Sequence, residues 1–172
     1  MIRHPRPAAR RPPVFNLPTA TKAVAAVVVL GFLVGLVPEL RWLSLAWLHF
    51  DPRAAPPGWV AGATTYGLLH GSVMHLVGNL LGIVILGPLV ERRQGAGALL
   101  FLLLLGAFGG AFTHTAVQLA TGGDAVLIGA SASVAALIGW SLRQIRDRRG
   151  FGELDQAVTI YGVFFIVFNL IG

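Results

Sequence analysis

The sequence predicts an all-α, polytopic transmembrane helical bundle in which five spans are present. Of its 172 residues, 55% are hydrophobic and only 12% are charged, whereas soluble domains carry about 25% charged residues. Apolar runs recur along the chain, and each is close to the ~20 residues that a bilayer-spanning helix needs. The chain contains no cysteine, which excludes disulfides and thiolate metal sites.

The first 21 residues are basic and rich in proline, which predicts a disordered tail. Such a tail can precede a signal peptide, but the apolar run at 22–37 lacks a convincing cleavage site and more apolar runs follow. We therefore expect 22–37 to be a retained first span. The connection after it is rich in tryptophan and proline and too polar to cross, so it should lie against the membrane interface.

Four further apolar runs complete a transmembrane domain that covers residues 22–172. The predicted spans are about 64–89, 96–118, 125–142 and 156–172. The polar stretches ERRQG, TGGD and RQIRDRRG separate them, as expected for turns outside the bilayer.

Lysine and arginine are distributed unevenly over the two sides of this five-span alternation. Of the 13 such residues, only Arg41 and Arg53 fall on one side, which leaves 11 on the side of the amino terminus. Positive residues gather on the cytoplasmic side. We therefore expect a cytoplasmic amino terminus, in what the composition suggests is a bacterial inner membrane. Topology also explains the net charge of +6 better than nucleic-acid binding does.

Polar side chains occur within two of the spans. The second span contains HGSVMHLVGN, in which His75 and Asn79 are four residues apart and share a helix face. His70 points elsewhere unless the helix begins just after it. The fourth span carries Ser131 within GASAS. Both spans run in the same direction, so at ~1.5 Å per residue Ser131 and His75 should lie at similar depth, roughly 10 Å below the outer surface.

These side chains have an ordinary interpretation and a functional one. A serine in a membrane helix usually bonds the carbonyl one turn before it, and small residues such as those beside Ser131 serve helix packing. A histidine inside a span is costlier and tends to face a cavity. As a set, Ser131 could act as a nucleophile while His75, Asn79 and the Ser131 backbone N–H donate to an oxyanion. Acyl transfer is thus one hypothesis but not a unique one.

Other functions for the polar residues are less favoured. A metal site or proton relay needs convergent ligands, but His70 and His75 differ in direction and no carboxylate lies near them in the span. A small transporter using the two histidines would often show repeated halves, and the chain has no internal repeat. Glu91 and the two arginines after it are expected to form a solvated turn, and His114 is expected to be interfacial without a role.

Together, the motifs resemble those of the rhomboid intramembrane serine proteases. His70, His75 and Asn79 match the HxxxxHxxxN pattern of that family's second span, and Gly129 and Ser131 match its GxSx pattern. The resemblance implies a six-helix core that cleaves transmembrane segments of other membrane proteins, without metal or cofactor. It makes Ser131 the nucleophile, His75 and Asn79 the oxyanion donors, His70 a supporting residue, and Gly129 a site of close backbone packing.

The sequence departs from the family pattern in three ways. Ala132 replaces the second glycine of the usual GxSG, and the family's Trp-Arg pair before the histidines is absent. More seriously, the family's catalytic base is a histidine on a sixth span, and no histidine follows Ser131. We favour a fragment of a longer rhomboid, inactive on its own. The alternative is a non-catalytic rhomboid-like protein that binds transmembrane segments.

Overall fold

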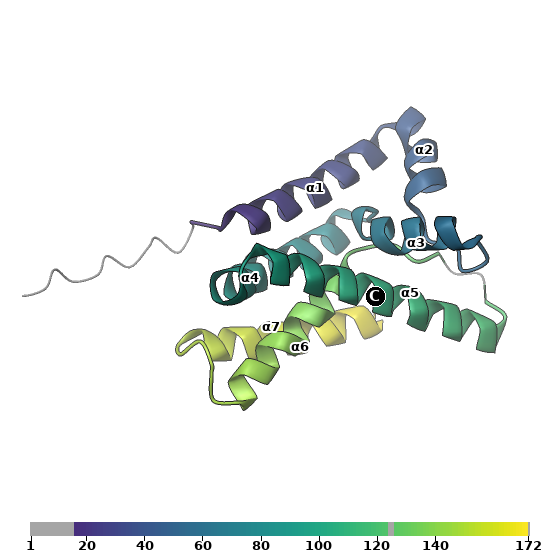
Figure 1. Ribbon diagram of the computed structural model, residues 1–172. Coiled ribbons are helices and arrows are strands. Elements are labelled where there is room, and N and C mark those ends of the chain that lie inside the picture. The colour runs from purple at the N-terminus through teal and green to yellow at the C-terminus, as the bar shows by residue number, and fades with distance from the viewer. Residues whose placement is uncertain (1–15, 124–125, 172) are drawn as a thin grey trace, which may run out of the picture.

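The computed structural model describes residues 16–123 and 126–171, and this part of the chain is a bundle of α-helices without a strand (Figure 1). The helices are α1 (Thr19–Leu36), α2 (Pro38–Leu48), α3 (Pro56–Thr65), α4 (Val73–Gln94), α5 (Ala96–Thr121), α6 (Ser131–Arg146) and α7 (Leu154–Ile171), with a 3₁₀ turn η1 at Tyr66–Leu68. The predicted all-α class is confirmed. The disordered tail predicted for residues 1–21 lies mostly outside the described residues.

Three of the described helices, α1, α4 and α5, are long and apolar enough to cross a membrane. Helix α6 has only 16 residues, and the apolar part of α7, Leu154–Val167, is also short. The chain is therefore an integral membrane protein, whereas the full set of five spans stays a prediction.

Two helices begin later than the predicted spans. The segment predicted as the start of the second span instead contains the end of α3, the turn η1 and four non-helical residues before α4. Ser72 starts α4, because its extended backbone (φ −154°, ψ 162°) and side chain cap the helix by accepting the His75 N–H. Similarly, α6 starts at Ser131 rather than near 125. Hydropathy misses both breaks because apolar residues flank them on both sides.

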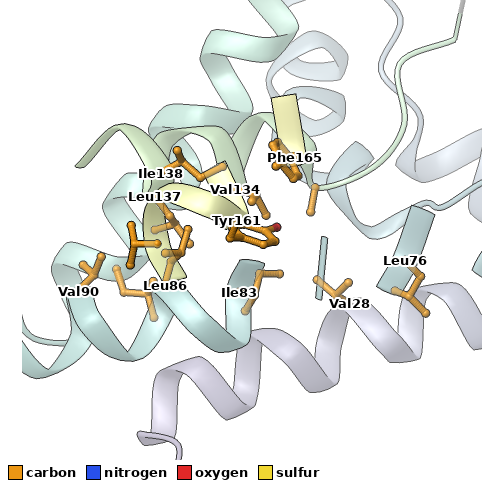
Figure 2. Packing of buried hydrophobic residues seen from close by; sticks show 13 residues of the cluster. Val28, Leu76, Ile83, Leu86, Val90, Val134, Leu137, Ile138, Tyr161 and Phe165 are labelled. Carbon is orange, nitrogen blue, oxygen red and sulfur yellow. The ribbon is translucent and has the colours of Figure 1, made fainter. Parts of the chain in front are cut away.

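Helix α4 is the centre of the bundle, with contacts to α1, α5, α6 and α7. In Figure 1, α2 turns sharply away from the end of α1, and α6 and α7 lie together below α4 and α5. Figure 2 shows the core where α4, α6 and α7 meet, with Ile83, Leu86, Val134, Leu137 and Tyr161 pointing toward one another. This packing holds the amino-terminal ends of α4 and α6 on the same side of the core.

Glycine brings α6 close to its neighbours. A Cβ atom at Gly106 of α5 would lie 2.5 Å from the Ala132 carbonyl oxygen, and one at Gly82 of α4 would lie 2.5 Å from Val134 Cγ1. No side chain fits at either position, so α6 packs directly onto the backbones of two helices. The Tyr161 hydroxyl of α7 fills the space above Gly82 and donates to the Gly78 carbonyl at 2.9 Å.

The expectation of a solvated turn at Glu91 is wrong. The Glu91 carboxylate accepts hydrogen bonds from the Ala20 N–H (2.9 Å), the Thr21 N–H (2.7 Å) and the Thr21 hydroxyl (2.8 Å). It thereby caps the amino terminus of α1, where a negative charge is favourable. Arg93, two residues on, donates to the Gly150 carbonyl at 2.6 Å. The last turn of α4 thus forms hydrogen bonds with both α1 and the loop between α6 and α7.

Candidate catalytic site

The start of α4 sets the positions of the two predicted oxyanion donors. With Ser72 as the cap, His75 lies in the first turn and Asn79 one turn later on the same face. The Asn79 side chain is only 1% exposed, whereas His75 is half-buried. His70 precedes the helix, so its direction is not tied to the helical period.

A hydrogen bond brings His70 to the same group. The Asn79 amide nitrogen lies 3.1 Å from His70 Nε2, so the amide donates to the unprotonated ring nitrogen. The rings of His70 and His75 are 5.1 Å apart between centroids, at 66° to each other. The two histidines and the asparagine of HGSVMHLVGN therefore form one contact group, with His70 orienting the Asn79 amide.

Gly129 joins this group to the segment before α6. Its φ of +95° is a conformation that only glycine adopts readily. A Cβ here would lie 2.5 Å from His75 Cε1 and 3.5 Å from Asn79 Nδ2. The Gly129 N–H donates to the Tyr66 carbonyl at 3.1 Å. Both the backbone angle and the space thus require glycine, and the segment lies directly against the imidazole and the amide.

Ser131 is two residues further along, at the first position of α6. Among the described residues, its hydroxyl has no hydrogen-bond partner, and the side chain is partly exposed. The first N–H groups of a helix have no partner within the helix, and this end carries partial positive charge. Ser131 therefore combines an unengaged hydroxyl with backbone donors suited to a developing negative charge.

The segment of residues 129–131 forms the Ser131 junction between η1, α4 and α6. Two side chains that were not predicted from the sequence, Tyr66 and Ser133, help to hold this junction in place. Tyr66 is 1% exposed, and its hydroxyl donates to the Ala107 carbonyl of α5 at 3.0 Å. The Ser133 hydroxyl donates to the Leu103 carbonyl at 2.7 Å. No local pattern distinguishes Tyr66 from any other buried aromatic residue, since its importance comes from contacts with distant segments.

The structure also explains the alanine at the position where the rhomboid motif usually has glycine. The Cβ atom of Ala132 occupies the space beside Gly110 of α5, where a side chain at Gly110 would come within 2.6 Å of it. The missing side chain at Gly110 makes room for the methyl group of Ala132. This departure therefore leaves the junction between Gly129 and Ser131 intact.

The remaining histidines with described positions lie elsewhere. His114 on α5 contacts Gln118 Nε2 at 2.9 Å, and its ring packs against Phe50 at 6.2 Å between centroids. His49 lies after α2 and contacts the Leu45 carbonyl. Within the described part of the chain, no group of three or more His, Asp or Glu side chains is arranged to hold a metal ion.

The fold and the site define a class: a helical membrane protein in which a glycine, two residues before a serine that starts a helix, packs against a His–Asn pair of a central helix. The chain matches the family model of the Rhomboid domain over residues 57–172. It belongs to the rhomboid family, whose members are intramembrane serine proteases that act on transmembrane substrates. The matched region includes every residue of the site described above.

Proposed function

We propose that this chain carries the nucleophile and the oxyanion-binding part of an intramembrane serine endopeptidase. The observation that supports this most strongly is the position of Gly129, which leaves no room for a Cβ atom beside the His75 ring and lies within contact distance of the Asn79 amide. That contact joins two segments that are about fifty residues apart in the sequence. Ser131 follows Gly129 by two residues, which supports its assignment to the same site as these hydrogen-bond donors.

In the proposed reaction, Ser131 Oγ attacks the carbonyl carbon of a peptide bond in a transmembrane segment. The carbonyl oxygen becomes an oxyanion, which His75, Asn79 and the Ser131 N–H stabilise by hydrogen bonds. The C–N bond then breaks, the serine proton passes by way of a base to the leaving amine, and water hydrolyses the acyl-enzyme. His70 acts through Asn79, whose amide it keeps in one orientation.

The proposal assigns the base to a histidine outside these 172 residues. None of the five histidines follows Ser131 in the sequence. His75 packs against Gly129, and His70 accepts from Asn79, so both are engaged on the side that stabilises charge. We propose that a sixth helix supplies the base, as the resemblance to rhomboid proteases implies.

The proposed setting is a bacterial inner membrane with the amino terminus in the cytoplasm. Eleven of the 13 lysines and arginines lie on the amino-terminal side of the five-span alternation, which favours this orientation. The starts of α4 and α6, and with them Ser131, then face the outer half of the bilayer. Water reaches a shallow site of this kind more easily than the membrane centre.

Cleavage of a transmembrane reporter in proteoliposomes tests the proposal. The 172-residue chain is compared with the same chain extended by a sixth helix that carries a glycine-flanked histidine. We expect cleavage only by the extended chain, and we expect Ser131→Ala to abolish it. Ser141→Ala is the matched control, because Ser141 is a buried serine of the same helix whose hydroxyl has no partner among the described residues.

Each arm of this experiment can contradict a different part of the proposal. Cleavage by the 172-residue chain that disappears in Ser131→Ala would show that the base lies within it. Cleavage by the extended chain that persists in Ser131→Ala would exclude Ser131 as the nucleophile. Reporter binding without cleavage by the extended chain would favour a non-catalytic protein.

A further inference from the structure

A groove of about 430 Å³ lies next to the start of α6, where Ala130 and Ser133 line it. Residues of α1 and α5 line it, together with Ile83 of α4, Ser133 of α6 and Ala130 just before α6. Ligand pockets in proteins span roughly 300–1,000 Å³, so the groove is large enough for a ligand. The assigned site uses none of this space.

The lining of the groove is apolar. Its only polar side chains are Thr64 and Ser133. Thr64 Oγ1 donates to the Ala61 carbonyl at 2.8 Å, and Ser133 Oγ donates to the Leu103 carbonyl at 2.7 Å. A buried water needs two to four polar partners, and these engaged hydroxyls are poor ones. The chemistry of the groove therefore selects a hydrocarbon occupant.

The mouth of the groove opens on a surface that faces lipid. Val27 of α1 is 50% exposed, and Leu100 and Leu104 of α5 are each 46% exposed at the rim. Both helices are long and apolar enough to span the membrane. Val27 and Leu104 lie about two turns from the starts of their helices, and Leu100 lies one turn from the start of α5. The groove is therefore continuous with the lipid-contacting surface at the depth of the acyl chains, away from the headgroups.

We propose that the acyl chain of a membrane phospholipid binds in this groove. Lipid tails are as apolar as leucine, so packing rather than the hydrophobic effect decides binding within the bilayer. An unfilled groove leaves its lining atoms without contacts on one side and loses their dispersion energy. An acyl chain restores these contacts, and the surrounding bilayer supplies it at high concentration.

The bound chain also supports the Ser131 junction. Ala130, 5% exposed, forms part of the floor and directly precedes Ser131. Gly67 lines the groove beside it, and a Cβ at Gly67 would lie 3.7 Å from Ala130 Cα. The lipid therefore packs against Ala130, next to Ser131. This binding requires no catalysis, so it stands or falls independently of the proposed protease activity.

Photo-crosslinking in nanodiscs tests the lipid site, with a phospholipid that carries a diazirine in its acyl chain. Adducts are mapped by mass spectrometry on the 172-residue chain. We expect them to concentrate on groove-lining residues such as Val24 and Leu103, above the level at outward-facing Phe112. Ala23→Trp narrows the mouth and should lower groove labelling about tenfold, the change that ~1.4 kcal/mol of lost binding produces.

Matched variants separate the groove from general contact with lipid. Ala26→Trp adds the same side chain at another exposed position of α1 that does not line the groove, and it should leave the labelling unchanged. Leu100→Trp and Phe101→Trp repeat the comparison from α5, with Leu100 at the rim and Phe101 outside it. If Ala23→Trp does not fold, the comparison of Leu100→Trp with Phe101→Trp tests whether the labelling comes from the groove.

Two results would overturn the proposal. One is equal labelling of groove-lining and outward-facing residues, which would make the groove ordinary lipid-facing surface. The other is crosslinking of the groove residues to a second copy of the chain instead of to lipid.

Discussion

The two ends of α4 are built in opposite ways. At its last turn, Glu91 accepts three hydrogen bonds from the start of α1. Arg93 lies 4.1 Å from the centre of the Phe151 ring and donates a hydrogen bond to the loop between α6 and α7. At its first turns, His75 and Asn79 face a glycine, and the Ser131 hydroxyl has no partner among the described residues. At the last turn, the polar groups are hydrogen-bonded, and they connect α4 to the start of α1 and to the loop between α6 and α7. The other end holds polar groups in place but leaves hydrogen-bonding capacity free.

This difference indicates which end serves stability and which serves chemistry. Groups that already hold partners strengthen the fold but cannot bind a developing charge without losing those partners. A group with a donor left over is available to a substrate, and the Asn79 amide has one, since only one of its two N–H groups is needed for His70. Variants at the two ends should therefore separate stability from activity.

Gly129→Ala should have the largest effect, because it affects both fold and site. The new Cβ meets His75, and alanine at φ +95° is strained. We expect a loss of roughly 2–5 kcal/mol in the free energy of unfolding, measured by denaturant titration in detergent. Gly122→Ala is the control, since its φ is also positive, at +69°, but no atom lies within 4 Å of the added Cβ. An equal loss in both variants would contradict the close contact with His75.

Asn79→Ala should lower activity far more than stability. Removal of one oxyanion donor costs about 10²–10³ in kcat, measured by reporter cleavage with the extended chain. His70→Ala should lower kcat less, because His70 acts only by orienting the Asn79 amide. A loss of activity that merely follows the loss of folded protein, recorded by unfolding of the same variants, would remove Asn79 from the site.

Glu91→Ala should lower stability but not activity. We expect a loss of roughly 1–2 kcal/mol in the free energy of unfolding, because the start of α1 loses its cap. Residual activity per folded molecule should be unchanged, because Glu91 lies at the end of α4 opposite the site. Glu39→Ala removes an exposed acid from the first turn of α2 and should have little effect. A fall in kcat without a fall in stability would contradict the division between the two ends.

Arg148→Gly should stabilise the protein by up to about 1 kcal/mol. Arg148 has φ +56°, and the Arg149 N–H donates to the Gln144 carbonyl at 2.9 Å, so α6 ends in a Schellman motif with arginine at the position that favours glycine. Thermal unfolding measures the gain. Arg149→Gly, at a neighbouring position without positive φ, should give no gain, and a gain there would contradict the backbone explanation.

The smallest effect is expected at Asp147, in the same loop. A hydrogen bond from Arg146 is the main cause that lowers the pKa of its carboxyl below the usual range of an aspartate. A depressed pKa stabilises the folded state above the unfolded value, and the contribution is lost as pH falls through the folded pKa. Because this pair is exposed, salt screens it. Asp147→Asn should therefore leave the pH dependence of unfolding almost unchanged, and a marked change would show a tighter ion pair.

Much of this protein could be predicted from the sequence because the bilayer restricts the possible structures. Backbone groups in a bilayer have no water to bind, so only helices and closed barrels cross it. Continuous apolar runs of about 20 residues fit helices rather than the short strands of a barrel, and the all-α class follows. The spacing of His75 and Asn79 placed them on one face because the helical period alone determines this. The motif around Ser131 pointed to the rhomboid family, and the match over residues 57–172 confirmed it.

Other features depend on contacts between distant segments, which no local pattern encodes. The breaks before Val73 and Ser131 depend on a serine cap and on a glycine with φ +95°, and hydropathy registers neither. Glu91 was expected to be solvated. Its hydrogen-bond partners at the start of α1 lie about seventy residues away in the sequence, so no local pattern indicates them. By itself the sequence determined the class, the family and the chemistry available. Only the tertiary structure decided which of these polar groups are engaged and which are free, because engagement depends on what packing brings within hydrogen-bond distance.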